Sequence, residues 1–265
     1  MTFFDGLILG LVQGLTEFLP VSSTGHLILA REFFHIGETD GLAVDAVLQL
    51  GTVLAVLLYF RSDLWKIFQT FLQFLFRKEV DSKEKTLLFS IFFGTIPAVI
   101  FGLLLEKKME VAFRDDFLVA IMLIFGSILF VIAEAWGKQM STLTIKKGIG
   151  IGFFQCLALL PGVSRSGATI SGGLLLGLSR EEAARFSFLL SFPIIAGSGL
   201  LKLKSLFSLG LLSSIGAPLF LGFITSFLVG LLTIGFLLRF LKTHSLIPFA
   251  IYRTALAFGI LLFAL

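Results

Sequence analysis

Two short polar motifs lie inside otherwise apolar stretches of the sequence, and both contain residue types that bind phosphate or move protons. The first occupies residues 13–26 and the second occupies residues 161–169. An ionisable side chain inside an apolar segment is costly to bury and is a functional candidate by default. Glu17, His26 and Arg165 meet this criterion.

The first motif has the pattern of one helix that stops and a second helix that starts. Gln13 and Glu17 are four residues apart, so on a helix their side chains share one face. Pro20 should end that helix, because proline cannot continue the backbone hydrogen bonding. A hydroxyl residue can then cap a new helix, whose free N–H groups form an anion site. The candidates for this cap are Ser22, Ser23 and Thr24.

The second motif repeats this design with Arg165 in the place of Ser23. Arginine suits phosphate because its planar fork donates two parallel hydrogen bonds and stays charged. Two helix N-termini that converge from opposite sides, together with one arginine, would form a cradle for a diphosphate. The residues expected to bind substrate in this cradle are Gln13, Ser22, Thr24, Gly25, Ser164, Ser166, Gly167 and Thr169.

Simpler structural roles compete with these assignments. Serine and threonine in membrane helices often only cap or pack, and this reading stays open for each of them. Gly10, Gly14 and Gly152 are expected to permit close helix contact. Asp45 and Glu134 lie near the ends of apolar stretches, where snorkelling or a loop contact is expected.

The composition indicates a membrane protein. Hydrophobic residues make up 57% of the 265 residues and charged residues 14%, against about 25% charged in a typical soluble domain. The net charge of +4 is spread over loops, so no nucleic-acid partner is expected. Cys156 is the only cysteine, which excludes an internal disulfide. No Lys or Arg precedes Arg31, and we predict no signal peptide.

Six apolar stretches have about the 20 residues that a spanning helix needs, and two further stretches are interrupted by polar residues. The predicted spans are Leu42–Phe60, Leu87–Leu105, Phe117–Trp136, Arg185–Leu201, Leu211–Leu238 and Leu246–Leu265. The interrupted stretches are Gly6–Phe34 and Lys147–Leu178. Six cations in the segment Arg61–Lys85 predict that it is cytoplasmic, with the Glu106–Asp116 loop outside. Within the cytoplasmic segment, Trp65–Phe76 has the composition of an interfacial helix.

An internal repeat organises the chain. When the sequence is shifted by 142 residues, seven of the twenty positions in Gly6–Gly25 are identical to Gly148–Gly167. Each copy is an interrupted segment followed by three spans, and an odd number of spans gives the two copies opposite orientations. We therefore predict an all-α polytopic membrane protein with six transmembrane helices and two re-entrant helical hairpins in an inverted-topology repeat. It would be a single domain over residues 1–265, with halves of about 1–140 and 141–265.

The motifs resemble those of the undecaprenyl-diphosphate phosphatase family, also called the bacitracin-resistance membrane phosphatases, over essentially the whole chain. The resemblance rests mainly on residues 13–26 and 161–169. Shorter matches lie at Asp45–Gly51, Ser179–Arg185 and Tyr252–Arg253. The first position of the family's paired acidic motif holds Glu or Gln; here it is Gln13, which leaves Glu17 as the only carboxylate of that motif.

The resemblance implies an activity and a place in the cell. The family hydrolyses undecaprenyl diphosphate to the monophosphate and so recycles the lipid carrier for cell-wall polymers. It implies location in the bacterial inner membrane, with the active site open to the outer face. It also implies a divalent cation (Mg or Ca), which we expect to bridge the substrate phosphates and Glu17 because the chain has too few carboxylates for an all-protein cage.

Two mechanisms and two functions stay open at this point. Ser23 could attack the phosphate as a nucleophile activated by His26, with Glu17 orienting the histidine or binding metal and Arg165 clamping the phosphates. An activated water could attack directly instead. Broken helices in an inverted repeat are also a transporter design, so the alternative is a flippase for prenyl phosphate. In either case the expected partners are a polyprenyl diphosphate lipid and the bilayer, and a homodimer is an open possibility.

Overall fold

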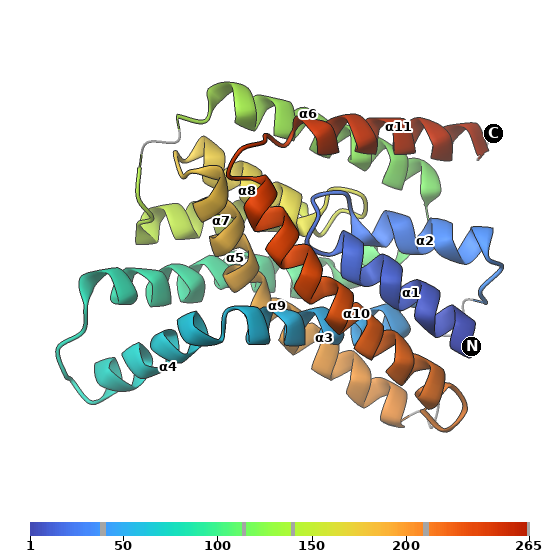
Figure 1. Cartoon of the computed structure of the whole chain (residues 1–265), viewed down its shortest axis with the longest axis horizontal. Helices are drawn as coiled ribbons and strands as arrows, with labels where there is room; N and C mark the ends of the chain where they lie inside the picture. The colour runs from blue at the N-terminus through green and yellow to red at the C-terminus, as the bar shows by residue number, and fades with distance from the viewer. Residues whose placement is uncertain (38–40, 113–114, 139–140, 209–211, 264–265) are drawn as a thin grey trace.

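A computed structural model describes residues 1–37, 41–112, 115–138, 141–208 and 212–263 (Figure 1). Every regular element in this part of the chain is an α-helix, which confirms the predicted all-α class. The helices of the described residues are α1 (Phe3–Thr16), α2 (Ser23–Phe33), α3 (Gly41–Tyr59), α4 (Arg61–Leu75), α5 (Ser82–Ala112), α6 (Asp116–Trp136), α7 (Ile145–Leu157), α8 (Arg165–Leu175), α9 (Arg180–Ser208), α10 (Leu212–Phe240) and α11 (Ile247–Phe263).

Four of these helices are long and apolar enough to cross a membrane, namely α5, α6, α9 and α10. A fifth candidate is α3 together with α4, which meet at a bend of 80°. The helices α1 and α11 are apolar but shorter than a span usually requires. The chain is therefore a multi-pass membrane protein, with four or five spans by this criterion among the described residues. The count of six stays a prediction.

Several helices extend beyond the predicted spans. The sequence predicts the fourth span over Arg185–Leu201, whereas α9 already begins at Arg180. This early start follows from Ser179, whose hydroxyl accepts the backbone N–H of Glu182 and caps the helix. Similarly, α5 continues to Ala112, through most of the segment expected to be an outer loop. The ends of two predicted spans lie outside the described residues: Leu211, Ala264 and Leu265.

Each polar motif folds as two helices joined by a tight turn. The bounds of α8 are those of α2 shifted by 142 residues, which is the offset of the sequence repeat. Ser22 and Ser164 precede these helices, and both have a φ of 74°, which is uncommon for a residue other than glycine. The two turns therefore share one backbone conformation as well as part of their sequence.

The helices of the two halves cross over and pack on each other. α1 lies along α10 and α7 lies along α5, so the first helix of each hairpin contacts a long helix of the other half. A Cβ atom added to Gly10 would lie 2.4 Å from the Gly222 carbonyl oxygen. A Cβ atom added to Gly152 would lie 2.2 Å from the Gly94 carbonyl oxygen. The expected close helix contact at Gly10 and Gly152 is confirmed.

Asp45 and Glu134 hold helices together, where the sequence suggested snorkelling or loop contacts. Asp45 accepts Nη1 of Arg31 at 3.1 Å, which ties α2 to α3. Glu134 accepts Nε of Arg180 at 3.0 Å and the backbone N–H of Leu246 at 2.7 Å. A carboxylate in an apolar surrounding needs a cation or N–H partner, so these pairs form inside the bundle and fix α6, α9 and α11 relative to one another.

Candidate active site

The turns of the two hairpins touch each other inside the protein, where their loops lie side by side in Figure 1. The hydroxyl of Ser166 in the second hairpin donates to the Leu19 carbonyl of the first at 3.4 Å. Arg253 of α11 donates to the Pro20 carbonyl at 3.3 Å and to the Val163 carbonyl at 2.8 Å. The two polar motifs, far apart in the sequence, therefore form one site.

Glu17 connects the two motifs through hydrogen bonds and an ion pair. Its Oε2 accepts a hydrogen bond from Gln13 Nε2 at 2.8 Å and one from Ser23 Oγ at 2.9 Å. Its Oε1 accepts Nη1 of Arg165 at 3.2 Å, across 148 positions of the chain. The Glu17 side chain is 5% exposed and that of Arg165 is 22% exposed, so the guanidinium can reach a ligand while it stays paired.

The Ser23 hydroxyl donates a hydrogen bond to Glu17, whereas we expected His26 to be its partner and to activate it. The Nδ1 of His26 bonds to the Ser22 carbonyl at 2.8 Å. A carbonyl only accepts, so Nδ1 carries a proton, and in the neutral imidazole Nε2 is then the acceptor. The group that Nε2 accepts from is the hydroxyl of Tyr252, at 2.7 Å, and the two rings are stacked 5.6 Å apart. His26 therefore pairs with Tyr252, and the base next to Ser23 is a carboxylate.

Two of the expected phosphate donors are used as helix caps. The N–H of Gly25 donates to Ser22 Oγ at 3.5 Å, and the N–H of Gly167 donates to Ser164 Oγ at 3.2 Å. The first intrahelical bond of α2 forms at His26 N, so two N–H groups at the start of the helix stay outside these bonds. The N–H groups that can bind an anion are thus those of the first two residues of α2 and α8.

The remaining predicted residues divide between the site and the packing around it. Ser164 and Ser166 lie 3.2 Å apart, hydroxyl to hydroxyl, in the second turn. Thr24 is partly exposed at the start of α2, next to Ser23. Thr169 is fully buried, and its hydroxyl bonds to the Arg165 carbonyl at 2.7 Å and to Ser187 of α9. The structure therefore places the Thr169 hydroxyl in the α8–α9 contact, where both of these bonds are internal to the protein.

Two residues of α11 belong to the site, although the sequence analysis gave them no role. Arg253 is fully buried and donates to five backbone carbonyls of both turns and of α6, while its guanidinium lies 4.7 Å from the Phe130 ring. Tyr252 is half-exposed beside His26. The sequence could have indicated Arg253 as a site residue, because it is an ionisable residue within the apolar stretch of the predicted sixth span.

The oxygen atoms around Glu17 suit a hard divalent cation that is shared with substrate. Gln13 Oε1 is buried and has no hydrogen-bond partner, although it lies on the residue that donates to Glu17. With the Glu17 carboxylate and the Ser23 hydroxyl it gives a small set of oxygen donors, and Mg²⁺ or Ca²⁺ would take its other ligands from phosphate and water. No group of three or more His, Cys, Asp or Glu side chains that could hold a metal is present in the described residues.

The fold and the site define a class of protein: a multi-pass helical membrane protein with a buried carboxylate–arginine pair between two similar hairpins. Residues 6–259 match the family described as "Bacitracin resistance protein BacA". The chain belongs to this family.

Curated relatives cover nearly the full length of the chain. The undecaprenyl-diphosphatase of Rubrobacter xylanophilus is 43% identical over 262 residues, which are 97% of this chain and 96% of the relative. That of Geotalea daltonii is 44% identical over 260 residues, with the same two coverages. That of Myxococcus xanthus is 44% identical over 270 residues, which are 100% of this chain and 89% of the relative.

Proposed function

We propose that this protein is an undecaprenyl-diphosphatase, which hydrolyses undecaprenyl diphosphate to undecaprenyl phosphate and inorganic phosphate and so returns the lipid carrier to cell-wall synthesis. Family membership and the names of the relatives support this activity. The observation in the structure that carries it is the contact of Glu17 with both Ser23 and Arg165. A nucleophile, a base and a phosphate-binding cation are thus joined at one point.

The proposed topology has six spans and two re-entrant hairpins in an inverted repeat within one membrane domain. The hairpins would be α1–α2 and α7–α8, and the spans would include the bent α3 and the shorter α11. The shared cap geometry of Ser22 and Ser164 and the reciprocal α1–α10 and α7–α5 contacts support this arrangement. The cations of Arg61–Lys85 favour a cytoplasmic location for that segment. We propose that the protein lies in the inner membrane, with its active site open to the outer face.

In the first proposed step, Ser23 Oγ attacks the terminal phosphorus of the substrate. The bond between that phosphorus and the bridging oxygen breaks, and undecaprenyl phosphate leaves with the electron pair. Glu17 takes the hydroxyl proton, because its Oε2 already accepts it at 2.9 Å. Arg165 and the first N–H groups of α2 and α8 stabilise the charge on the transferred phosphoryl group.

In the second step, water attacks the phosphoserine, the bond from phosphorus to Oγ breaks, and Ser23 regains the proton from Glu17. The proton of the water goes to the hydroxyl oxygen of Tyr252, as the proton of that hydroxyl moves to His26 Nε2. His26 then releases its extra proton to the solvent, which restores the neutral imidazole for the next cycle. The 2.7 Å hydrogen bond between these two groups and the half-exposed position of Tyr252 support this role. Direct attack by water is the competing mechanism.

A divalent cation is a further part of the proposal. Gln13 Oε1, Glu17 and Ser23 Oγ would hold it on the protein side. When bound, it would neutralise charge on the phosphate oxygens of the substrate.

Phosphate release from undecaprenyl diphosphate by the purified protein tests the activity. We expect turnover by the wild type and a trapped phosphoserine at Ser23, detected by mass spectrometry after acid quench. Release of phosphate without phosphoserine would favour direct attack by water. Translocation of prenyl phosphate across liposomes without phosphate release would contradict the proposal and favour the flippase, which the names of the relatives do not support.

A further inference from the structure

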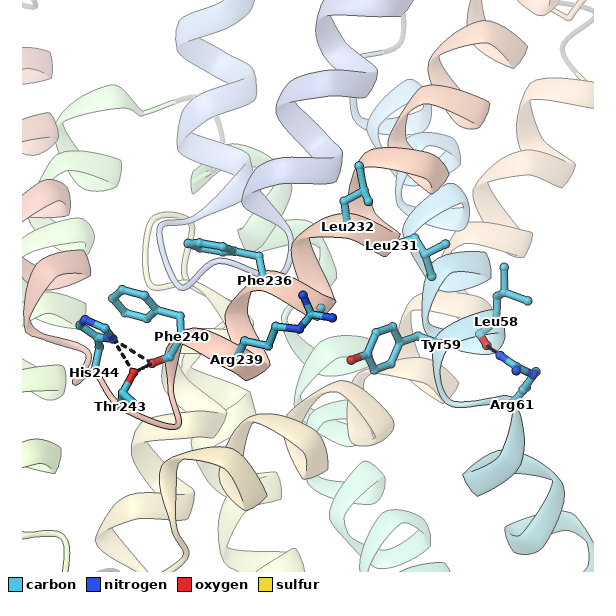
Figure 2. A pocket seen from close by; sticks show the side chains of 11 residues that line it. Leu58, Tyr59, Arg61, Leu231, Leu232, Phe236, Arg239, Phe240, Thr243 and His244 are labelled. Carbon is cyan, nitrogen blue, oxygen red and sulfur yellow. Dashed lines mark hydrogen bonds between the residues drawn. The ribbon is translucent and has the colours of Figure 1, made fainter.

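A pocket lined by residues of α3, α4 and α10 lies outside the group of residues around Glu17 (Figure 2). It has a volume of about 830 Å³ and lies between the end of α3, the start of α4 and the last turns of α10. In Figure 2 the side chains of Arg239 and Tyr59 point toward one another across it. The lining residues are Leu58, Tyr59, Arg61, Leu231, Leu232, Gly235, Phe236, Arg239, Phe240, Thr243 and His244.

Two arginines line this pocket without an acidic partner. In the described part of the chain, neither Arg61 nor Arg239 forms an ion pair, and the pocket lining contains no Asp or Glu. Arg61 donates one hydrogen bond, from Nη1 to the Leu58 carbonyl at 3.2 Å, which leaves most of its fork free. Arginine forks of this kind bind phosphate oxygens in pairs.

Two cations in neighbouring segments, Arg185 and Lys242, are neutralised by acidic residues, unlike these two arginines. Arg185 pairs with Asp63 of α4, and Lys242 pairs with Glu181 at 3.2 Å. Acidic residues are therefore present near this end of the bundle, but they do not reach the pocket.

The other end of the pocket is apolar and lies deeper along the spans. Arg239 is in the last turn of α10, and Leu232 lies seven residues earlier, about 10 Å along the helix. Arg61 follows the 80° bend, while Leu58 lies before it on α3. The exposed side chains of Trp65 and of the phenylalanines that follow it on α4 are typical of a helix at the membrane surface. In a bilayer that spans α3 and α10, the arginines would therefore lie at headgroup depth, next to an apolar wall.

We propose that this pocket binds an anionic glycerophospholipid. Arg61 and Arg239 would bind the phosphate, and one acyl chain would lie on Leu58, Leu232 and Phe236. Basic pockets between membrane helices on the cytoplasmic side are suited to anionic headgroups. The charge and the depth of the pocket match both parts of one such lipid, and neither depends on the phosphatase activity.

Lipid binding to the delipidated full-length protein, measured by native mass spectrometry, tests this proposal. The probes are phosphatidylglycerol and phosphatidylcholine with identical acyl chains, which differ in net charge. We expect the wild type to bind phosphatidylglycerol more tightly. Arg61→Gln and Arg239→Gln should each weaken this binding about fivefold, as expected for one cation near an anionic lipid surface. The matched control is Lys66→Gln, which removes an exposed cation of α4 outside the pocket.

Three results would overturn the proposal: equal affinity of the wild type for both lipids, unchanged affinity in the double variant Arg61→Gln/Arg239→Gln, or an equal loss in Lys66→Gln. Displacement of phosphatidylglycerol by a lower concentration of prenyl monophosphate would also contradict it and assign the pocket to the reaction product. Circular dichroism and gel filtration show whether the variants fold. Phosphate release is measured separately, so a failure here does not bear on the proposed activity.

Discussion

The two hairpins share a backbone and differ in chemistry. Ser22 and Ser164 have the same φ and both cap a helix of eleven residues. Yet Glu17 of the first hairpin corresponds to Leu159 of the second, and His26 corresponds to Ala168. The second hairpin is also the more enclosed, because every residue of α8 from Ser166 to Leu174 is buried, while α2 buries four.

This difference indicates how one motif served two purposes. The enclosed hairpin presents one partly exposed cation, Arg165, from a helix whose other residues are mostly buried. In the proposed mechanism, the more open hairpin holds Glu17 and His26, the groups that exchange protons. Arg253 bonds to carbonyls of both turns, so a residue of neither hairpin connects the two turns.

Exchanging the side chains at positions 23 and 165 should break the site most severely. In the variant Ser23→Arg/Arg165→Ser, the serine hydroxyl lies on the second hairpin. At the position equivalent to Glu17, that hairpin carries Leu159, which cannot act as a base. Without an adjacent base, turnover should fall by about 10³-fold or more. The measurement is phosphate release, with Lys66→Gln as a control. Turnover within tenfold of the wild type would show that the hairpins are interchangeable.

Replacing Arg253 should loosen both hairpins at once. Arg253→Met leaves several buried carbonyls without donors, and each such group costs about 1–3 kcal/mol. We expect a clear fall in the thermal unfolding midpoint in detergent, with loss of turnover, and partial rescue by Arg253→Lys. A stable, active Arg253→Met variant would show that the turns hold their positions without this residue.

Removing the hydroxyl of Tyr252 tests the proposed proton path from Tyr252 of α11 to His26 of the first hairpin. Tyr252→Phe keeps the stacking on His26 and deletes the hydrogen bond. Turnover should fall about 10²-fold, and phosphoserine should accumulate because the second step is slowed. The unfolding midpoint should stay within a few degrees of the wild type. A lower phosphoserine level than in the wild type would place Tyr252 in the first step instead.

Corresponding glycines test whether the two halves pack alike. Gly10→Ala and Gly152→Ala each introduce a methyl group against a backbone carbonyl of a long helix. Each should destabilise the protein by about 1–3 kcal/mol, as overpacking does, and by similar amounts. Thermal unfolding measures both, with Gly259→Ala on α11, where an added Cβ meets no atom within 4 Å, as the control. A loss confined to one variant would show that the packing is not reciprocal.

The sequence predicted the elements better than their contacts. Proline and capping residues place the ends of α1, α2 and α8, because these signals are local. We predicted His26 as the partner of the Ser23 hydroxyl, and this was wrong, because the hydroxyl bonds to Glu17. A spacing of three residues on a helix puts His26 within reach of Ser23. It cannot show that His26 Nε2 is already hydrogen-bonded to Tyr252, more than 200 positions away. Contacts of this kind depend on how separate helices pack, which no short motif encodes.

The most direct test of the account is a double-mutant cycle across the two hairpins. Glu17→Gln removes the carboxylate and Arg165→Met removes the cation of the contact at 3.2 Å, and each should lower turnover about 10²-fold. Because the two residues act as a unit, the double variant should be within about tenfold of the weaker single variant. Losses that multiply to about 10⁴-fold would contradict the claim that activity depends on the meeting of the two hairpins.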